Sequence, residues 1–318
     1  MSLPPTPLAP AQALPELPSG QLPLAHWGVI QITGADAASF IHGQLSNDFV
    51  LLPDGGARLA ALCTAKGRMQ ASFVGVRSSS SDIRLVCSRD VLAPTLKRLS
   101  MFVLRAKATL RDATEDFALW GLSGQACLPL AQTTPWTCAR MGSADVVQLY
   151  PAGGQARQLW MGPPGEAPPP AAHLEAQQWA LGEVLSGVAT VNAAVVEAFV
   201  PQMLNYESVD GVSFKKGCYP GQEVVARSQF RGTLKRRAYI LVGDANAELA
   251  PGQDLFSSLD EAQACGTVVQ VAQAPSGQRY CIASLQTEAA AHGVLHAGSA
   301  QGPVLGIIAL PYALRDDI

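Results

Sequence analysis

Hydrophobic and polar positions alternate with two different periods along residues 24–110, and this pattern predicts a mixed α+β lobe. Apolar residues at every second position indicate strands, and apolar residues three and four apart indicate helices. The expected strands are residues 24–33, 58–64, 69–77, 83–88 and 102–110. The expected helices are residues 37–45, with Asp36 as N-terminal cap, and residues 90–101, with Asp90 as cap. The order predicts helices packed on one face of an antiparallel sheet.

The middle of the chain continues with strand-like runs and then turns helical. Expected strands lie at residues 115–121, 145–150 and 156–161. Residues 162–171 are rich in Pro and Gly, which predicts a surface linker. Helices are expected at about residues 172–185 and from residue 222 to 231.

After Arg237 the pattern changes to short β-like runs separated by Gly, Pro and Ser. The runs are residues 238–243, 264–272, 279–286 and 304–310, and no helical period is visible among them. They predict a C-terminal β-barrel or sandwich over residues 238–318. At the other end, six prolines between residues 4 and 18 predict a mobile tail over residues 1–21. Residues 22–237 then form the body of the protein.

Composition indicates a globular protein of the reducing cytoplasm. The chain is 48% hydrophobic and 15% charged, which suits a packed core. No apolar run reaches the ~18–20 residues of a membrane span, and no signal peptide is recognised. The seven cysteines include no Cys-x-x-Cys pair, and His292 and His296 lack partners with ligand spacing. We therefore expect reduced thiols, no permanently bound metal and no membrane partner.

Charge is concentrated in residues 214–237. This segment holds seven of the 22 basic residues and one acid, so it carries +6 in a chain of net charge −3. Cys218 lies inside it, in a turn marked by Gly217, Pro220 and Gly221. Because a positive field favours the thiolate, the pattern predicts a reactive thiol. The alternative is an inert cysteine that fills a gap in the turn.

The centre of the segment carries a recognisable motif. Lys216-Gly-Cys-Tyr-Pro-Gly-Gln-Glu223 closely resembles the signature of the YgfZ-type folate-binding proteins, relatives of the glycine-cleavage aminomethyltransferase. The motif positions are Lys216, Gly217, Cys218, Tyr219, Gly221, Gln222 and Glu223. Other stretches agree in order and spacing, namely residues 32–36, 43–44, 47–48, 65–68, 199–202 with Asn205, and 212–216. The resemblance covers about residues 22–312.

The resemblance implies an aminomethyltransferase-like α+β fold with three domains in a ring. Two interleaved α+β lobes of ferredoxin-like type and the C-terminal barrel would surround a folate pocket. It implies tetrahydrofolate or a derivative as cofactor, contacted by Trp27, Trp179, Gln202 and Asn205. The two tryptophans have core packing as their alternative.

The resemblance also implies a biological role, that of an accessory protein. Such a protein supports iron–sulfur enzymes and tRNA thiomethylation. Iron–sulfur enzymes or cluster carriers would be transient partners, and tRNA an indirect or weak one. Cys218 could contact a cluster only with other ligands, because a cluster takes about four.

The basic residues that follow Cys218 have three interpretations. The residues concerned are Arg227, Arg231 and Lys235. They could bind the carboxylates of a folate tail, form a solvent-exposed surface, or contact RNA phosphates. We rank these in that order, because a sequence pI near 6.0 disfavours a dedicated nucleic-acid binder.

Two departures from the aminomethyltransferase pattern bear on mechanism. Its paired aspartates are replaced by Ala71 and Ser72, which cannot act as acid or base. A glutamate that binds the pterin amino group falls at Leu185, with Glu183 two residues earlier and so expected to point elsewhere on the helix. The sequence thus favours an accessory role; the alternative is a one-carbon transferase or demethylase with another acid.

Overall fold

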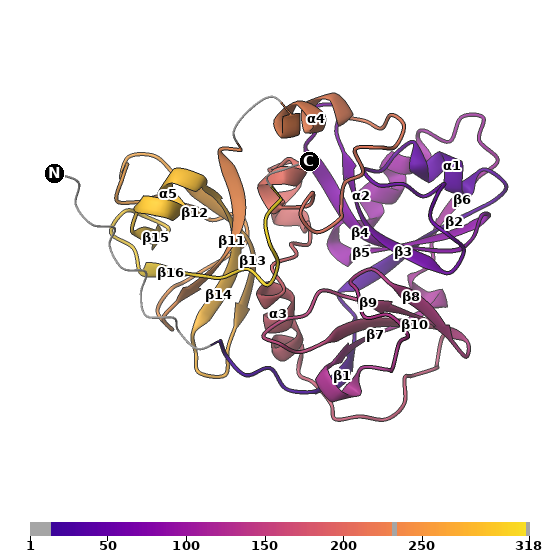
Figure 1. Cartoon of the computed structure of the whole chain (residues 1–318), viewed down its shortest axis with the longest axis horizontal. Helices are drawn as coiled ribbons and strands as arrows, with labels where there is room; N and C mark the ends of the chain where they lie inside the picture. Colours follow the sequence, from indigo (N-terminus) through magenta and orange to yellow (C-terminus); the bar gives the residue numbers. More distant parts are fainter. Residues whose placement is uncertain (1–13, 231–233, 316–318) are drawn as a thin grey trace.

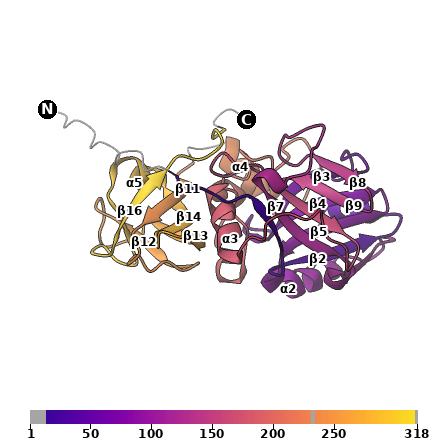
Figure 2. The ribbon, with the colours of Figure 1, turned by 90° about the horizontal axis from the view of Figure 1, so that it is seen from below.

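Two five-stranded antiparallel sheets and one closed barrel make up the fold (Figure 1). The computed structural model describes residues 14–230 and 234–315. The barrel lies at one end of the molecule and the two sheets lie together at the other, with helix α3 between them (Figures 1 and 2). Within the described residues, no helix is long and apolar enough to cross a membrane.

The first lobe is an antiparallel sheet in the order β3-β4-β5-β2-β6, covered by two helices. Its elements are β2 (Trp27–Thr33), α1 (Ala37–His42), β3 (Gly56–Cys63), β4 (Met69–Ser79), β5 (Asp82–Ser88), α2 (Arg89–Ser100) and β6 (Thr109–Asp112). Side chains of both helices share an apolar cluster with the inner face of the sheet, as the two periods predicted.

Three details of this lobe differ from expectation. The strand expected at residues 102–110 is only β6, because residues 101–108 form turns instead. Helix α2 is preceded by Ser88, so Asp90 is not its cap and instead accepts a hydrogen bond from the Ser88 hydroxyl (2.7 Å). Asp36 precedes α1 but makes no capping bond there; its carboxylate accepts the N–H of Lys107 (2.7 Å).

The second lobe is a sheet in the order β1-β7-β10-β9-β8. Its strands are β1 (Gly20–Pro23), β7 (Ala118–Ser123), β8 (Cys138–Met141), β9 (Ala144–Gln148) and β10 (Arg157–Gly162), and short 3-10 helices lie at Thr114–Asp116 and Gly124–Ala126. Because β1 precedes the whole first lobe in the chain, the two lobes are interleaved. The expected tail therefore ends earlier than residue 21: Leu17 is buried, Gly20 and Gln21 pair with β7, and residues 1–13 lie outside the described residues.

Strands β11–β16 close the barrel in the order β11-β14-β13-β12-β15-β16. They are β11 (Arg236–Gly243), β12 (Asp254–Ser257), β13 (Gly266–Gln273), β14 (Arg279–Gln286), β15 (Leu295–Ala297) and β16 (Val304–Ile308). A short helix, α5 (Thr287–His292), covers one edge and was not expected, because six residues are too few to show a helical period.

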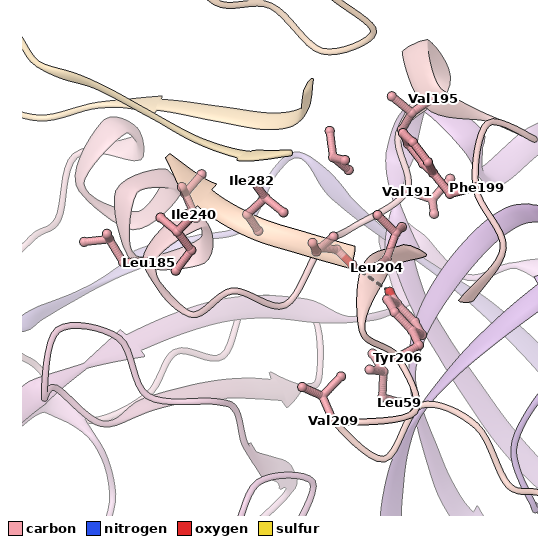
Figure 3. Packing of buried hydrophobic residues seen from close by; sticks show 14 of the residues in the cluster. Leu59, Leu185, Val191, Val195, Phe199, Leu204, Tyr206, Val209, Ile240 and Ile282 are labelled. Carbon is pink, nitrogen blue, oxygen red and sulfur yellow. Dashed lines mark hydrogen bonds between the residues drawn. The ribbon is translucent and has the colours of Figure 1, made fainter. Parts of the chain in front are cut away.

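Helix α3 (Ala176–Leu185) follows the expected linker and joins the three parts. It packs on β13 and β14 of the barrel. The chain then runs through 3-10 helices at Ala193–Val195 and Pro201–Leu204 to helix α4 (Gln222–Phe230). The buried side chains of this central region come from the first lobe, the β9–β10 turn of the second lobe, α3, the following segment and the barrel. A single apolar cluster therefore fastens all three parts (Figure 3).

Candidate functional site

A cavity opens where α3 meets the two lobes. Its free volume is about 520 Å³ when the open space at its mouth is included. Trp27 from β2 and Trp136 from the loop before β8 contribute aromatic walls, and Glu183 and Arg157 are its charged residues. Trp27 is 8% exposed and lines the cavity, and its contact with folate stays a prediction.

Glu183 supplies the acidic group of the cavity and is 7% exposed. Its Oε1 accepts a hydrogen bond from Trp179 Nε1 (3.0 Å) and lies 3.4 Å from His26 Nε2. Gln270 of the barrel donates to the other oxygen, Oε2 (3.4 Å). These contacts come from three parts of the fold and fix a carboxylate in the wall of the cavity.

The expectation that Glu183 points away from the site is wrong. Leu185 instead belongs to the apolar cluster with Ile240 and Ile282 of the barrel (Figure 3). The reason is the rotation of α3: two residues along a helix turn by about 200°, so only one of the two positions faces the cavity. Glu183 is therefore the carboxylate that a cavity ligand would meet.

Trp179 lies behind the wall and does not line the cavity, in contrast to the expected stacking role. It is one of the largest fully buried side chains, and its indole binds Glu183 at one edge. The guanidinium carbon of Arg157 lies 4.3 Å from its ring centroid. Trp179 thus positions Glu183 and Arg157, two groups that line the cavity. Trp136, which was not predicted from the sequence, lines the cavity itself.

The two residues that replace the paired aspartates lie in different surroundings. Ala71 is buried in the core of the first lobe, whereas Ser72 lines the cavity. The Ser72 hydroxyl accepts the N–H of Val191 (2.9 Å). A hydroxyl engaged in this way holds the backbone and cannot serve as a proton donor or acceptor of carboxylate strength.

Two of the motif stretches meet in space next to Cys218. Gly221 has φ +81°, and a side chain there would lie 2.3 Å from the carbonyl oxygen of Thr64. Gly67, with φ +71°, likewise approaches Val224 of α4. Both glycines are required because only they combine this backbone conformation with so close a contact.

Lys216 anchors the other side of the turn. Its ammonium donates to the carbonyls of His42 and Leu45, next to the C-terminal end of α1, and lies 4.7 Å from the ring centroid of Tyr219. Burial lowers the pKa of Lys216 to about 8, while Asp48 and Cys218 act in the opposite direction. Lys216 is therefore a structural cation that also lies within electrostatic reach of the thiol.

Asp48 and His42 form a second polar cluster beside this turn. Asp48 Oδ1 accepts the backbone N–H groups of Val50 (2.9 Å) and Leu51 (2.8 Å) and lies 3.1 Å from His42 Nδ1. Burial raises the pKa of Asp48, but the two N–H groups and His42 outweigh it, so the pKa falls below its ordinary value.

Asp48→Asn is expected to lower the free energy of unfolding by about 1 kcal/mol at pH 7, because the amide is a weaker acceptor for these groups. Since the folded-state pKa is lowered, the contribution is fully present above the unfolded value of about 3.9 and is lost as pH falls through the folded value. Urea unfolding of both proteins at pH 7, 5 and 3.5 measures this. A difference that stays constant across this range would contradict it.

Gln202 and Asn205 are structural anchors, not cavity residues. The Gln202 amide donates to the carbonyl of Val225 (2.8 Å) and so holds α4. Asn205 adopts a left-handed conformation, and its amide exchanges two hydrogen bonds with the backbone of Ala238 in β11. Both side chains are fully buried and neither lines the cavity, so the predicted folate contacts do not follow from their positions.

The basic segment does not form one cationic face. Arg237 is buried against Glu207, and Arg236 donates to the carbonyl of Cys265 (3.2 Å). Arg227 pairs with Glu223 on the exposed side of α4 (2.9 Å). Lys235 is exposed and away from the cavity lining, and Arg231 lies outside the described residues.

An open groove adjoins the cavity, with Trp136 lining both. Its cations are Arg58, Lys215 and Arg315, and Arg315 pairs with Asp210 (2.8 Å). Arg58 donates to Asn47 (3.3 Å), but its buried Nε has no hydrogen-bond partner in the described part of the chain. The sequence reading missed Arg58 and Arg315, because neither lies near Cys218 in the chain.

No protein-family model matches the chain. The chain is 31% identical to the tRNA-modifying protein YgfZ of Sodalis glossinidius (strain morsitans), an alignment that covers 94% of this chain and 96% of the relative. It is also 31% identical to the tRNA-modifying protein YgfZ of Yersinia enterocolitica serotype O:8 / biotype 1B (strain NCTC 13174 / 8081), covering 97% and 98%. The chain belongs to the YgfZ family.

The expected fold of this YgfZ-family chain is confirmed by a solved structure. Aminomethyltransferase T of the glycine cleavage system from Bartonella henselae superimposes with a TM-score of 0.62 over 93% of this chain and 86% of the other. The two sequences are only 15% identical, so the likeness concerns the fold. Among residues 14–230 and 234–315, no group of three or more His, Cys, Asp or Glu side chains could hold a metal ion.

Cys218 should be the one cysteine of this YgfZ-family protein that reacts in the folded state. All seven cysteines are described, and Cys218 alone is exposed. Burial raises the pKa of the Cys63, Cys87, Cys127 and Cys138 thiols to about 12. We expect iodoacetamide to add one label per chain, measured by mass spectrometry, and Cys218→Ser to add none. Rapid labelling of a second cysteine before unfolding would contradict this; urea should expose all the others.

Proposed function

We propose that this protein is a folate-binding accessory protein that supports iron–sulfur enzymes and tRNA modification. The observation that carries the proposal is the cavity in which an aromatic face, Trp27, stands with a buried carboxylate, Glu183. A pterin has a flat apolar face and an edge rich in N–H donors, which such a cavity complements. The names of the YgfZ relatives support a role in tRNA modification.

The residues present fit a reduced folate. Glu183 would accept from the N–H groups of the pterin, and Trp27 and Trp136 would contact its ring. The carboxylates of the tail would lie in the adjoining groove near Arg58 and Lys215, in place of Arg227, Arg231 and Lys235. Tetrahydrofolate, when bound, carries one-carbon units.

Cys218 has a separate place in this proposal. The thiol is exposed and does not line the cavity, so it can reach a partner protein without disturbing a bound folate. We expect it to react with, or transiently ligate, a group presented by an iron–sulfur enzyme or cluster carrier, which would supply the remaining ligands.

Titration calorimetry with tetrahydrofolate tests the folate part. Binding with one site per chain supports it, and no binding at millimolar ligand overturns it. Restoration of a cluster-dependent tRNA-thiomethylating enzyme in a deletion strain tests the accessory part. The wild-type chain should restore activity and Cys218→Ala should not; full rescue by the alanine variant would show that the thiol is dispensable.

The second candidate is a folate-dependent one-carbon transferase or demethylase, which the aminomethyltransferase fold favours. Against it stands Ser72, whose hydroxyl is bonded to the backbone where acid–base chemistry would need a carboxylate. Formation of methylene-tetrahydrofolate from an aminomethyl or N-methyl substrate would show that the protein is such an enzyme.

A further inference from the structure

Arg157 is a buried cation that has no anionic partner among residues 14–230 and 234–315. It begins β10, is 3% exposed and lines the cavity. Its guanidinium makes no hydrogen bond or ion pair with the part of the chain that the structure describes, and its Nε is fully buried. Burial lowers the pKa of Arg157 to about 10, partly offset by Glu183, so the group remains charged at neutral pH. A buried charge without such partners destabilises the folded protein unless a bound group accepts its hydrogen bonds.

The fold holds this cation beside Glu183. The guanidinium lies over the Trp179 ring, and the same indole donates to Glu183 one helical turn later. Gly182 makes room, because a side-chain carbon there would lie only 3.2 Å from Arg157 Nε. One wall of the cavity therefore presents a set of donors next to a set of acceptors, and neither neutralises the other by direct contact.

The edge of a 4-oxopterin has the complementary order. Its 2-amino group and N3–H donate, and the adjacent oxygen on C4 accepts. In a 4-aminopterin the C4 substituent donates and N3 carries no hydrogen, so the order is reversed at both positions.

We propose that Arg157 and Glu183 together recognise the 4-oxopyrimidine edge of the bound pterin, with Arg157 donating to the C4 oxygen and Glu183 accepting from N3–H and the 2-amino group. This inference rests on the proposed folate function. It assigns to Arg157 the selection of 4-oxo over 4-amino pterins, because a 4-amino group would leave the buried guanidinium unpaired and place donor against donor.

The test compares tetrahydrofolate with tetrahydroaminopterin, which differs only at C4, by titration calorimetry. Wild type should bind the 4-oxo ligand roughly 10–100-fold more tightly, since a site built to hydrogen-bond a group rejects the analogue that lacks it. Arg157→Met should lose most of this preference by weakening the 4-oxo ligand alone. Arg98→Met, which removes another arginine stacked on a ring, that of Phe102, should change neither affinity.

The outcomes separate the inference from the proposed function. If wild type binds neither ligand, the folate function itself fails. If it binds both equally, or if Arg157→Met weakens both alike, folate binding stands and the role of Arg157 is overturned. A further arm uses 6-methyltetrahydropterin and p-aminobenzoylglutamate: loss of the second alone in Arg157→Met would place the guanidinium on the tail carboxylates and overturn the proposal.

Folding of the variant is checked independently. Removal of an unpaired buried charge should leave the melting temperature of ligand-free Arg157→Met at or above that of wild type. A clear decrease would show that the guanidinium is already satisfied within the protein, which also contradicts the proposal.

Discussion

Glu183→Gln should weaken tetrahydrofolate binding by roughly 10–100-fold, the effect of losing a charge-assisted hydrogen bond in a buried site. The amide keeps one oxygen for Trp179 Nε1, so the helix and the indole should stay in place. It replaces the second acceptor by a donor, which would face the N–H groups of the ligand. Titration calorimetry of the two proteins under identical conditions measures the change in dissociation constant.

Glu288→Gln is the matched control, because it makes the same chemical change on the exposed side of α5. This variant should bind as wild type does. Equal affinity of Glu183→Gln and wild type would show that the carboxylate does not contact the ligand. A lowered melting temperature of Glu183→Gln without ligand would instead point to a role in joining α3 to the barrel through Gln270.

Arg237→Met should lower the free energy of unfolding by about 3–5 kcal/mol, since it leaves the buried carboxylate of Glu207 without its cation. The side chains of the pair are only 5% and 0% exposed. Arg237 also donates to the carbonyl of Arg315, so it fastens β11 to the C-terminal segment as well. Urea unfolding followed by circular dichroism measures the loss.

Two comparisons show whether the buried pair is the cause. Arg227→Met breaks an exposed pair, 65% and 85% accessible, and should change stability by less than about 0.5 kcal/mol. The double variant Arg237→Met/Glu207→Met should recover part of the loss, because no charge is left uncompensated. Equal losses in Arg237→Met and Arg227→Met would contradict the explanation.

The sequence was sufficient for most of the fold because its periodic segments are long. Strands β2 to β5 of the first lobe and strands β11, β13 and β14 of the barrel are each at least seven residues long, and they were predicted within a few positions. Several of the shortest elements were missed, because so few positions show no period; they are β1, β8, β12, β15 and α5. The run 102–110 was misjudged because Phe102 and Leu104 are exposed and the chain enters the sheet only at Thr109.

The site was harder to predict, since its residues come together only in three dimensions. Trp27 was named from the resemblance and lines the cavity, but Trp136 and Arg157 lie in a loop and at a strand start that carry no motif. For α3, the choice between Glu183 and Leu185 depends on the rotation of the helix against the barrel, which spacing within one helix does not reveal.

The basic segment shows the same limit for charge. Seven cations within 24 residues suggested one electropositive surface around Cys218. In the folded chain Lys216 binds carbonyl groups next to the end of α1, and Arg237 binds Glu207, so much of this charge serves internal contacts. A count of charges along the chain cannot distinguish such buried cations from exposed ones.

A crystal structure with bound tetrahydrofolate tests the central claim most directly. We expect the pterin ring in the cavity against Trp27, its amino edge on Glu183, its C4 oxygen at Arg157, and the tail in the groove beside Arg58. Folate bound elsewhere on the protein, with the cavity between Trp27 and Glu183 left to water, would contradict the claim.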